Sequence, residues 1–398
     1  MRVREKVLLL TCASVVLAAC QPSLPDGTVC DGRILVADGD ETLGRALDEA
    51  SNGDCVVLRA GSYTGDRSVP AGVVLAGEKD AEVILRGEQA PAALRLDHEG
   101  ATLANLTLRS GTGLGLWITA PAVVVRGVTI EDFAQGAVGI RCQDAGCARG
   151  DGTITIDDSV VTRSRYGIGL AAGALRLCST SSTAHRSTGL SGGIGLFVTG
   201  ESSLEMTGGE VKDSDLGMVL DGSGAAISLQ DVQVLGNLDR GLWAQGLRGS
   251  IDAPALLIRG AQTRISGNGY VGVGLHDSQD VRIEGGRIDG TVLKPVPVEL
   301  GTVRDIGDGL AVLGSSARIH VDGAALDNNG RSQALIDSGG EGIQLSARTT
   351  VEAQQGQYLV VVQNTQASVD VPANLVSPVS DLPVRGEPQV SVPELDAP

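Results

Sequence analysis

The sequence predicts an all-β fold, a single-stranded right-handed parallel β-helix in which one short coil of chain is stacked on the next. Three observations support this prediction: few aromatic residues, a recurring glycine motif, and alternating apolar runs between its copies. Of the 398 residues, 56 are glycine and only 2% are aromatic. A thick globular core would need more large aromatic side chains, whereas the narrow core of a solenoid can be filled by small branched ones.

A Gly-apolar-x-apolar motif recurs along the chain and sets the length of the coils. It begins at Gly115, Gly139, Gly167, Gly193, Gly217, Gly241, Gly272, Gly309 and Gly342, so the shortest spacing is 139 − 115 = 24 residues. Two or three short strands fit into one such repeat. Stacked coils then place each strand against the same strand of the next coil, about 4.8 Å away.

Between the motifs, apolar residues alternate with polar ones, as in residues 123–130, 153–156, 226–234 and 281–288. This period of two is typical of strands with one buried face. Asp213, Asn237 and Asn268 each stand four positions before a motif glycine, where we expect left-handed corners. The longer repeats predict inserted loops over residues 141–152 and 290–307.

The N-terminus has the pattern of an export signal and is excluded from the fold. Three basic residues, Arg2, Arg4 and Lys6, precede an apolar stretch over residues 7–17. This stretch is shorter than the ~20 apolar residues that a membrane-spanning helix needs. We therefore expect residues 1–19 to be a cleaved signal peptide.

The segment Leu17-Ala18-Ala19-Cys20 resembles the lipobox of bacterial lipoproteins. The resemblance implies that Cys20 is lipidated and becomes the first residue of the mature chain. The alternative is an ordinary secretory signal that happens to contain a cysteine. Residues 20–30 then form a tether to a membrane that two or three acyl chains hold stably. Gln21 in place of an aspartate favours the outer membrane.

The chain is strongly acidic. Its formal charge is −17, and the three basic and one acidic residue of segment 1–19 sum to +2, so the mature chain carries −17 − 2 = −19. Such a charge repels polyanions at long range. It argues against nucleic acid as a partner, and it admits a polyuronate only where a local basic groove or bound cations intervene.

Export to an oxidising compartment permits disulfides. The cysteines that remain after processing are Cys30, Cys55, Cys142, Cys147 and Cys178. Cys30 and Cys55 bracket the start of the fold, and we expect them to pair and to stabilise it by about 3 kcal/mol. Cys142 and Cys147 stand in one loop and form the second expected pair. Cys178 is then odd, unless it competes for Cys142. The spacing does not support a metal site.

The start of the predicted solenoid is a short amphipathic helix over residues 42–50, with Leu43, Ala46, Leu47 and Ala50 on one face. An apolar strand at 53–58 and then Gly61-Ser62-Tyr63 follow it. This succession resembles the opening of many members of the pectin-lyase-like superfamily of right-handed parallel β-helices. The resemblance covers residues 31–365 and implies that the helix caps the open end of the core.

The C-terminal segment 366–398 is rich in proline, which blocks regular ladder bonding. We expect this tail to be extended along the last coils or disordered.

The resemblance implies a carbohydrate ligand, because most enzymes of the superfamily act on polysaccharides. Hydrolases of the polygalacturonase type need paired aspartates together with Gly-His-Gly and Arg-x-Lys motifs. Asp157-Asp158 is the one adjacent aspartate pair in the predicted coils, and the two companion motifs are absent from these coils. The competing interpretation of this pair is the chemistry of a turn.

Two further candidates come from the same resemblance. Asp305 and Asp308, in the longest insertion, are weak candidates for the Ca²⁺ site of a lyase, although calcium takes six to eight oxygen ligands. His276-Asp277 faintly resembles the Asp-Pro-His motif of mannuronan epimerases without its Asp-Pro. An exposed position at the edge of a coil is the competing interpretation for His276.

Trp117 and Trp243 both stand two residues after a motif glycine, at equivalent positions several coils apart. Alternation with Leu116 and Ile118 places Trp117 on the outer face of its strand. The two rings are therefore candidate platforms for a sugar, aligned and exposed along one sheet. The alternative is that they pack beneath loops.

Two hypotheses about function follow. The first is a membrane-anchored β-helix lipoprotein with a non-catalytic binding or structural role and a carbohydrate as the candidate ligand. The second is a polysaccharide lyase or glycoside hydrolase, for which the fold is the sole argument. No cofactor is expected, apart from Ca²⁺ in the case of a lyase. Outward-facing Asp, Arg, Lys or His residues that converge in a cleft would favour the enzyme.

Overall fold

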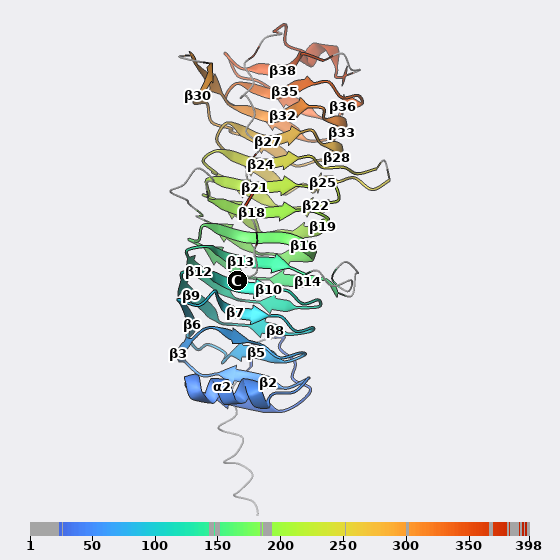
Figure 1. The fold of residues 1–398 in the computed structure, drawn as a ribbon. Coiled ribbons are helices and arrows are strands. Elements are labelled where there is room, and N and C mark those ends of the chain that lie inside the picture. The colour runs from blue at the N-terminus through green and yellow to red at the C-terminus, as the bar shows by residue number, and fades with distance from the viewer. Residues whose placement is uncertain are drawn as a thin grey trace, which may run out of the picture.

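A computed structural model describes residues 24–25, 27–142, 147, 152–183, 185, 193–250, 252–299, 302–365, 369–379, 382, 390, 392–393 and 395. These residues form the predicted right-handed parallel β-helix, whose coils pass in turn through three parallel sheets, A, B and C (Figure 1). The predicted signal peptide and Cys20 lie outside the described residues. Within the described ranges, no helix is long and apolar enough to cross a membrane.

Three short strands per coil build the sheets, and β16 (Tyr166–Cys178) bends from sheet C into sheet A. The other strands of sheet A are β1 (Ile34–Ala37), β2 (Cys55–Leu58), β5 (Val74–Gly77), β8 (Thr102–Ala104), β11 (Val124–Arg126), β14 (Ile154–Asp157), β19 (Ser202–Thr207), β22 (Ala226–Gln230), β25 (Leu256–Arg259), β28 (Gln279–Glu284), β33 (Ala317–Asp322), β36 (Ile343–Leu345) and β39 (Val369–Asp370). Sheet B consists of β3 (Gly61–Thr64), β6 (Val83–Glu88), β9 (Thr107–Gly111), β12 (Thr129–Phe133), β15 (Val160–Thr162), β17 (Ser181–Thr183), β20 (Glu210–Lys212), β23 (Gln233–Leu235), β26 (Arg264–Ser266), β29 (Arg287–Asp289), β34 (Ala325–Asp327) and β37 (Thr350–Glu352). The remaining strands of sheet C are β4 (Arg67–Ser68), β7 (Ala92–Leu96), β10 (Leu114–Ile118), β13 (Gly136–Arg141), β18 (Ile194–Thr199), β21 (Leu216–Asp221), β24 (Arg240–Gln245), β27 (Val271–His276), β32 (Asp308–Gly314), β35 (Ser332–Ser338) and β38 (Tyr358–Gln363).

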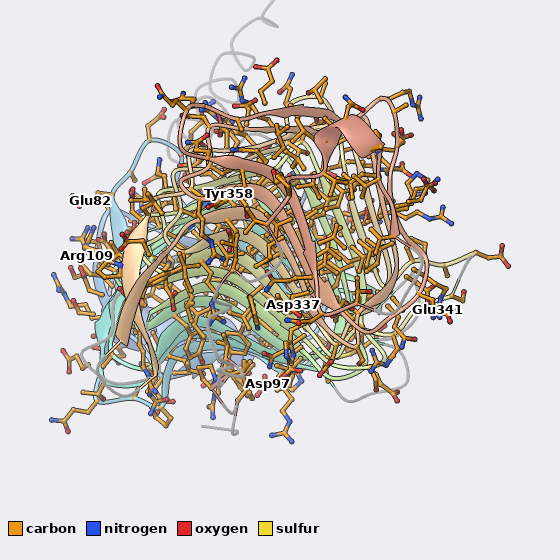
Figure 2. All side chains as sticks on the ribbon, turned by 90° about the horizontal axis from the view of Figure 1, so that it is seen from above. Glu82, Asp97, Arg109, Asp337, Glu341 and Tyr358 are labelled. Atoms are coloured by element: carbon orange, nitrogen blue, oxygen red, sulfur yellow. A yellow bond between two sulfur atoms is a disulfide. The ribbon has the colours of Figure 1, made fainter. Side chains whose placement is uncertain are left out.

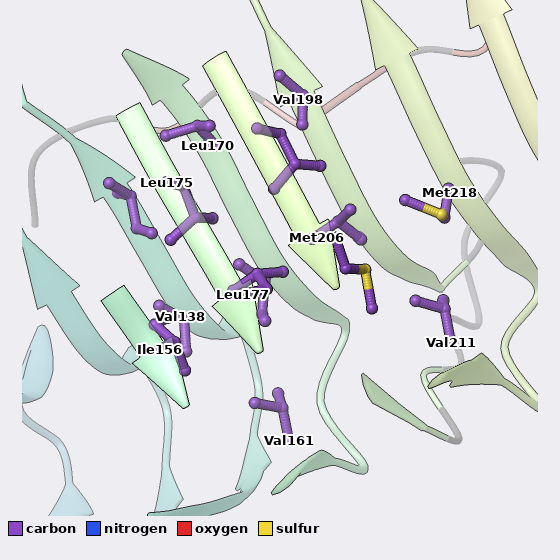
Figure 3. Packing of buried hydrophobic residues seen from close by; sticks show 14 of the residues in the cluster. Val138, Ile156, Val161, Leu170, Leu175, Leu177, Val198, Met206, Val211 and Met218 are labelled. Carbon is purple, nitrogen blue, oxygen red and sulfur yellow. The ribbon is translucent and has the colours of Figure 1, made fainter. Parts of the chain in front are cut away.

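The core consists of columns of aliphatic side chains, because the parallel register places equivalent residues of successive coils on top of one another. In sheet C, Leu116, Val138, Ile168, Leu196 and Met218 form one such column. Figure 3 shows the packing of neighbouring columns from sheets A, B and C. Each side chain packs against the same position one coil away, which explains why small branched residues suffice.

A ladder of buried polar side chains runs inside the corner between sheets B and C. Each member accepts a hydrogen bond from a backbone N–H of the preceding coil: Ser214 N donates to Asn237 Oδ1 (3.1 Å) and Asn237 N to Asn268 Oδ1 (3.0 Å). Asp213, just before this ladder, has the predicted left-handed conformation, with φ of 56°. Asn237 and Asn268 do not, because they are ladder members and Gly236 and Gly267 occupy the left-handed corners instead.

The ladder explains the motif glycines. A Cβ atom on Gly217 would lie 2.7 Å from Asn237 Nδ2, and one on Gly241 would lie 2.6 Å from Asn268 Nδ2. Glycine is therefore required where the chain passes the ladder. Three glycines of the predicted motif do not align with Gly217 and Gly241. Ala137 and Gly195 occupy the equivalent positions in place of Gly139 and Gly193, and Gly342 precedes a strand of sheet A. The spacing of glycines in the sequence does not give the register between coils, so these three predictions are wrong.

The first coil is closed by α2 (Asp40–Glu49), which agrees with the predicted capping helix. Its Leu43, Ala46 and Leu47 are buried, and the disulfide Cys30–Cys55 ties the preceding segment to β2. The second expected disulfide, Cys142–Cys147, is also present, and Cys178 is unpaired and half-buried. The insertion expected at 290–307 contains an antiparallel hairpin of β30 (Lys294–Glu299) and β31 (Thr302–Ile306).

Charged side chains project outward all around the coil. Residues at equivalent places lie on the same side even when many coils separate them, as Asp97 after β7 and Asp337 in β35 do (Figure 2). After β39 the chain forms the 3₁₀ turn η3 (Ala373–Leu375). The described residues of the C-terminal tail then lie along the outside of sheet C, where Leu382, Val390 and Leu395 contact β38, β24 and β13. They reach further back than the last coils, along which the tail was expected to lie.

Candidate functional site

The outer face of sheet A has two hollows, one lined in part by Pro254 and the other by Ser250, both from the connection between β24 and β25. Figure 1 shows this connection projecting from the solenoid. The first, the central groove, has a volume of about 360 Å³ and lies over β16, β19, β22 and β25. Ala174, Ala226 and Leu257 contribute apolar surface to it, and Arg176 and Glu205 form an ion pair of 3.0 Å. This groove offers an apolar surface with a polar rim.

The second, the Arg282 hollow, has a volume of about 170 Å³ and is richer in charge. It is lined by Ser250, Asp280, Arg282, Arg318, His320 and Gly342. Arg282 of β28 is in direct register with His320 of β33 on the next coil, so both project from the same column of the sheet. Ser250 comes from the connection 246–255. Two guanidinium groups and an imidazole therefore converge on one open hollow.

Asp280 and Arg318 form an ion pair between aligned positions of two neighbouring coils. Both have left-handed conformations, with φ of 58° and 53°, at aligned positions of β28 and β33. Arg318 Nε and Nη2 donate to the two carboxylate oxygens of Asp280, each at 2.7 Å, and Nη2 also donates to Gln279 Oε1 at 2.9 Å. The hydrogen bonds from Arg318 lower the pKa of the Asp280 carboxyl, which is 5% exposed, and raise the pKa of Arg318.

This chemistry suits an anionic group better than it suits hydrolysis. Hydrolysis of a glycoside uses two carboxyl groups about 5 to 9.5 Å apart. The lining of the Arg282 hollow holds one carboxylate, and Arg318 occupies both of its oxygens. In the part of the chain that the structure describes, no three His, Cys, Asp or Glu side chains gather as a metal site would require.

The aspartate candidates lie elsewhere. Asp157 ends β14 and pairs with Arg126 at 3.7 Å, while Asp158 is a left-handed corner with φ of 45°. Asp158 therefore has the turn role that was the competing interpretation, whereas Asp157 ends a strand and forms an ion pair. Asp308 is 1% exposed, and its carboxylate accepts from Arg331 Nε at 2.9 Å and from Ser332 Oγ at 2.6 Å.

Asp305 lies on β31 of the hairpin and is exposed. It is therefore not placed with the buried Asp308 in one ligand set. His276 is largely buried at the end of β27, and its ring stacks on Trp243 with centroids 6.1 Å apart. Asp277 forms the following corner and accepts from Ser315 N at 2.6 Å, which lowers the pKa of its carboxyl. The expected exposed edge position of His276 is therefore wrong, because the ring is covered.

Trp117 and Trp243 occupy the same outward column of sheet C, as the sequence predicts. Their predicted exposure is wrong: the two residues are 4% and 5% exposed. Trp243 packs over Gly274 of the next coil, where a Cβ atom would lie 2.1 Å from the indole ring, and the guanidinium of Arg240 lies 4.0 Å from the ring centroid. Val390 and Leu395, far away in sequence, belong to the same buried cluster as the two tryptophans.

The residues of the Arg282 hollow were not among the sequence candidates. The signal was present, because Val281-Arg282-Ile283 and Ile319-His320-Val321 are alternating runs whose middle residues point outward. Their adjacency was hidden by the hairpin insertion between the two coils, which makes the repeat irregular there.

Comparison with known structures tests the fold. No family model matches the sequence, and no curated protein matches it. The Dettilon tailspike protein (gp208) matches with a TM-score of 0.50 and 11% identity over 83% of this chain and 63% of its own. The chain has the pectin-lyase-like fold. Two other right-handed parallel β-helices match this chain with lower scores. The A-module of the Azotobacter vinelandii mannuronan C-5 epimerase AlgE6 has a TM-score of 0.49 and 15% identity over 88% of this chain and 97% of its own. Pectate lyase Pel9A has a TM-score of 0.36 and 10% identity over 90% and 81%.

Proposed function

We propose that this pectin-lyase-like protein is an exported, lipid-anchored protein that binds an anionic polysaccharide along sheet A without cleaving it. The observation that carries the proposal is the convergence of Arg282 and His320, in register on neighbouring coils, on one open hollow beside the Arg318–Asp280 ion pair. Guanidinium groups bind carboxylates through paired, charge-assisted hydrogen bonds. A local basic site of this kind is what an acidic chain needs in order to hold an acidic polymer.

The shape of the face supports a polymer over a small ion. The outward column from Arg176 to Gln344 passes through six coil steps, about 29 Å at ~4.8 Å per coil. Both hollows lie along it. In the central groove, apolar side chains suit the C–H faces of sugar rings, while the serine and charged groups of the rim suit hydroxyls.

The test compares binding to uronate polymers and to a neutral glucan of similar length. Polygalacturonate and alginate are suitable probes because the names of two proteins that share this fold, a pectate lyase and a mannuronan epimerase, refer to uronate polymers. The double variant Arg282→Ala/His320→Ala should lose at least about tenfold in affinity, which corresponds to removing ~1.4 kcal/mol. Arg86→Ala, an exposed arginine on sheet B, is the matched control and should bind as the unaltered protein does.

Binding to the uronates should weaken as salt rises, since the contacts are exposed charges. Equal affinity of the double variant and the control, or equal binding of the neutral glucan, would contradict the proposal.

A lyase or hydrolase is the second candidate, because Arg282 could neutralise a uronate carboxylate beside His320 as a proton acceptor. The assay incubates each uronate polymer with the protein, with and without Ca²⁺, and measures unsaturated and reducing ends. We expect neither product. Product formation that His320→Ala abolishes would establish the enzyme instead.

The anchor part of the proposal rests on Cys20 and is tested separately. Growth with an alkyne-labelled fatty acid should label the protein and place it in the outer-membrane fraction, while Cys20→Ala should abolish the label. Labelling that survives this substitution would rule out lipidation at Cys20. The two disulfides agree with an oxidising compartment.

A further inference from the structure

The outer face of sheet C carries an apolar strip that is buried although it faces away from the core. Its members share one register column, with Trp117, Phe197, Val219, Trp243, Leu335 and Val361 as its large side chains. Phe197 is fully buried, and Tyr166 packs against it edge to face with ring centroids 5.1 Å apart. Sheet faces of this kind are normally covered by something.

The described residues of the C-terminal tail supply part of the cover. Val390 and Leu395 belong to the same buried cluster as the strip, and Leu382 and Val392 pack against it. The contact runs from the coil of β38 back to that of β13, since Leu382 lies at the first and Leu395 at the second. A segment at the end of the sequence therefore lies over strands from the middle of it.

Two glutamines hold the tail by its backbone. Gln363 Oε1 accepts from Leu382 N and Gln363 Nε2 donates to Leu382 O, both at 2.8 Å. Gln245 repeats the arrangement with Val390, whose N donates to Oε1 at 3.1 Å and whose O accepts from Nε2 at 3.3 Å. The two glutamines occupy the same register position four coils apart.

The clamps and the strip are linked chemically. Gln245 Oε1 also accepts from the indole Nε1 of Trp243 at 2.9 Å, so the ring orients the amide that binds the tail. Arg141 Nη1 donates to Leu395 O at 2.9 Å and continues the row of side chains that bind the tail backbone. Such hydrogen bonds recognise any extended peptide backbone, while the apolar strip selects peptides with apolar side chains.

We propose that the outer face of sheet C is a binding strip for an extended apolar peptide, and that the tail is its intramolecular ligand. The tail is a strap, held by side chains at intervals and joined to the solenoid at one end. Its release leaves the stacked coils intact and exposes Trp117 and Trp243. Because the strap is tethered, its effective concentration is in the millimolar range, which excludes weak competitors.

The test removes the strap and supplies it again as a separate molecule. A chain truncated after Val379 should expose the strip, and a synthetic peptide of residues 380–398 should bind it and restore the native signal. The chain has two tryptophans, both on the strip, so intrinsic fluorescence reports on this surface alone. Truncation should move the emission to longer wavelength and increase acrylamide quenching severalfold.

The clamps should govern the affinity of the peptide. In the truncated chain, Gln245→Ala/Gln363→Ala should weaken peptide binding about tenfold or more, since each clamp contributes two backbone hydrogen bonds. Gln230→Ala, on sheet A, is the matched control and should bind the peptide normally. A folded truncated chain with native fluorescence, or one that binds no peptide, would overturn the proposal.

A second form of the protein covers the case in which the truncated chain does not fold. A protease site placed at residues 380–381 of the full chain is cut after folding. The cut strap should stay bound during size-exclusion chromatography and exchange with labelled peptide over time. Immediate loss of the cut strap, or a strap that never exchanges, would refute the reversible contact.

Discussion

At the scale of single residues, the ladder of the B–C corner contains a histidine where the neighbouring coils use serine and asparagine. His185 is fully buried, and its Nδ1 accepts a hydrogen bond from Ser164 N of the preceding coil at 3.4 Å, as the other ladder members do. Its Nε2 lies 3.1 Å from Ser182 Oγ. Burial lowers the pKa of His185 to about 4, against an ordinary value of 6.5. The imidazole is therefore a neutral hydrogen-bonding group of the interior.

This depressed pKa makes stability depend on pH. Between pH 6.5 and about 4 the unfolded chain binds a proton at His185 that the folded chain does not. The contribution of the neutral imidazole to the free energy of unfolding is therefore complete above pH 6.5 and falls as the pH decreases. The loss at pH 4 is on the order of 3 kcal/mol. Urea unfolding of the protein and of His185→Gln at pH 7.5, 6, 5 and 4 measures it as the difference between the two. A difference that does not change with pH would contradict this assignment.

The sequence could place His185 in a corner rich in serine and threonine, but it could not supply its partners. Ser164 lies one coil and 21 residues earlier, and finding it requires the exact length of that coil, which is shorter than the smallest spacing of the glycine motif. The same limit applied to Arg282 and His320. By contrast, Trp117 and Trp243 were placed correctly on one outward column, and their burial was missed because Val390 and Leu395 of the same buried cluster are remote in sequence.

At the scale of elements, the start of the solenoid and its corners differ in how far the sequence predicts them. The capping helix was predictable, because amphipathic spacing is local and its Leu43 and Leu47 are buried as expected. The Cys30–Cys55 pair was predictable from its position at the start of the fold. The left-handed corners were predicted in type, but the roles of Asn237 and Asn268 differed because ladder bonding depends on the neighbouring coils.

The first disulfide should stabilise the N-terminal coils more than the rest of the molecule. It closes a separation of 25 residues, and a loop of this size contributes about 3 kcal/mol. In a solenoid each coil contacts its neighbours alone, so Cys30→Ser should increase hydrogen exchange in α2, β2 and β5 while β24 to β35 stay protected. Cys178→Ser, which removes an unpaired thiol, is the control and should leave both regions unchanged. Uniform loss of protection along the chain would contradict the local role.

At the scale of the whole molecule, the polar ladder joins coil to coil along the inside of the solenoid, and Asn237 stands near its middle. Asn237→Ala removes the acceptor of Ser214 N and the donor to Asn268 Oδ1, leaving buried groups unpaired. We expect a cost of about 1 to 3 kcal/mol. Gln233→Ala, exposed on the preceding strand, should change the free energy of unfolding by less than ~0.5 kcal/mol.

The distribution of this effect distinguishes a stack of coils from a single cooperative core. Because each rung bonds to the next one alone, the lost protection in Asn237→Ala should centre on β20 to β27 and decline toward both ends of the solenoid. Hydrogen exchange resolved by strand measures this gradient. An equal loss of protection in β2 and β35 would mean that the coils open together, and the strap along sheet C would then be the element that couples them.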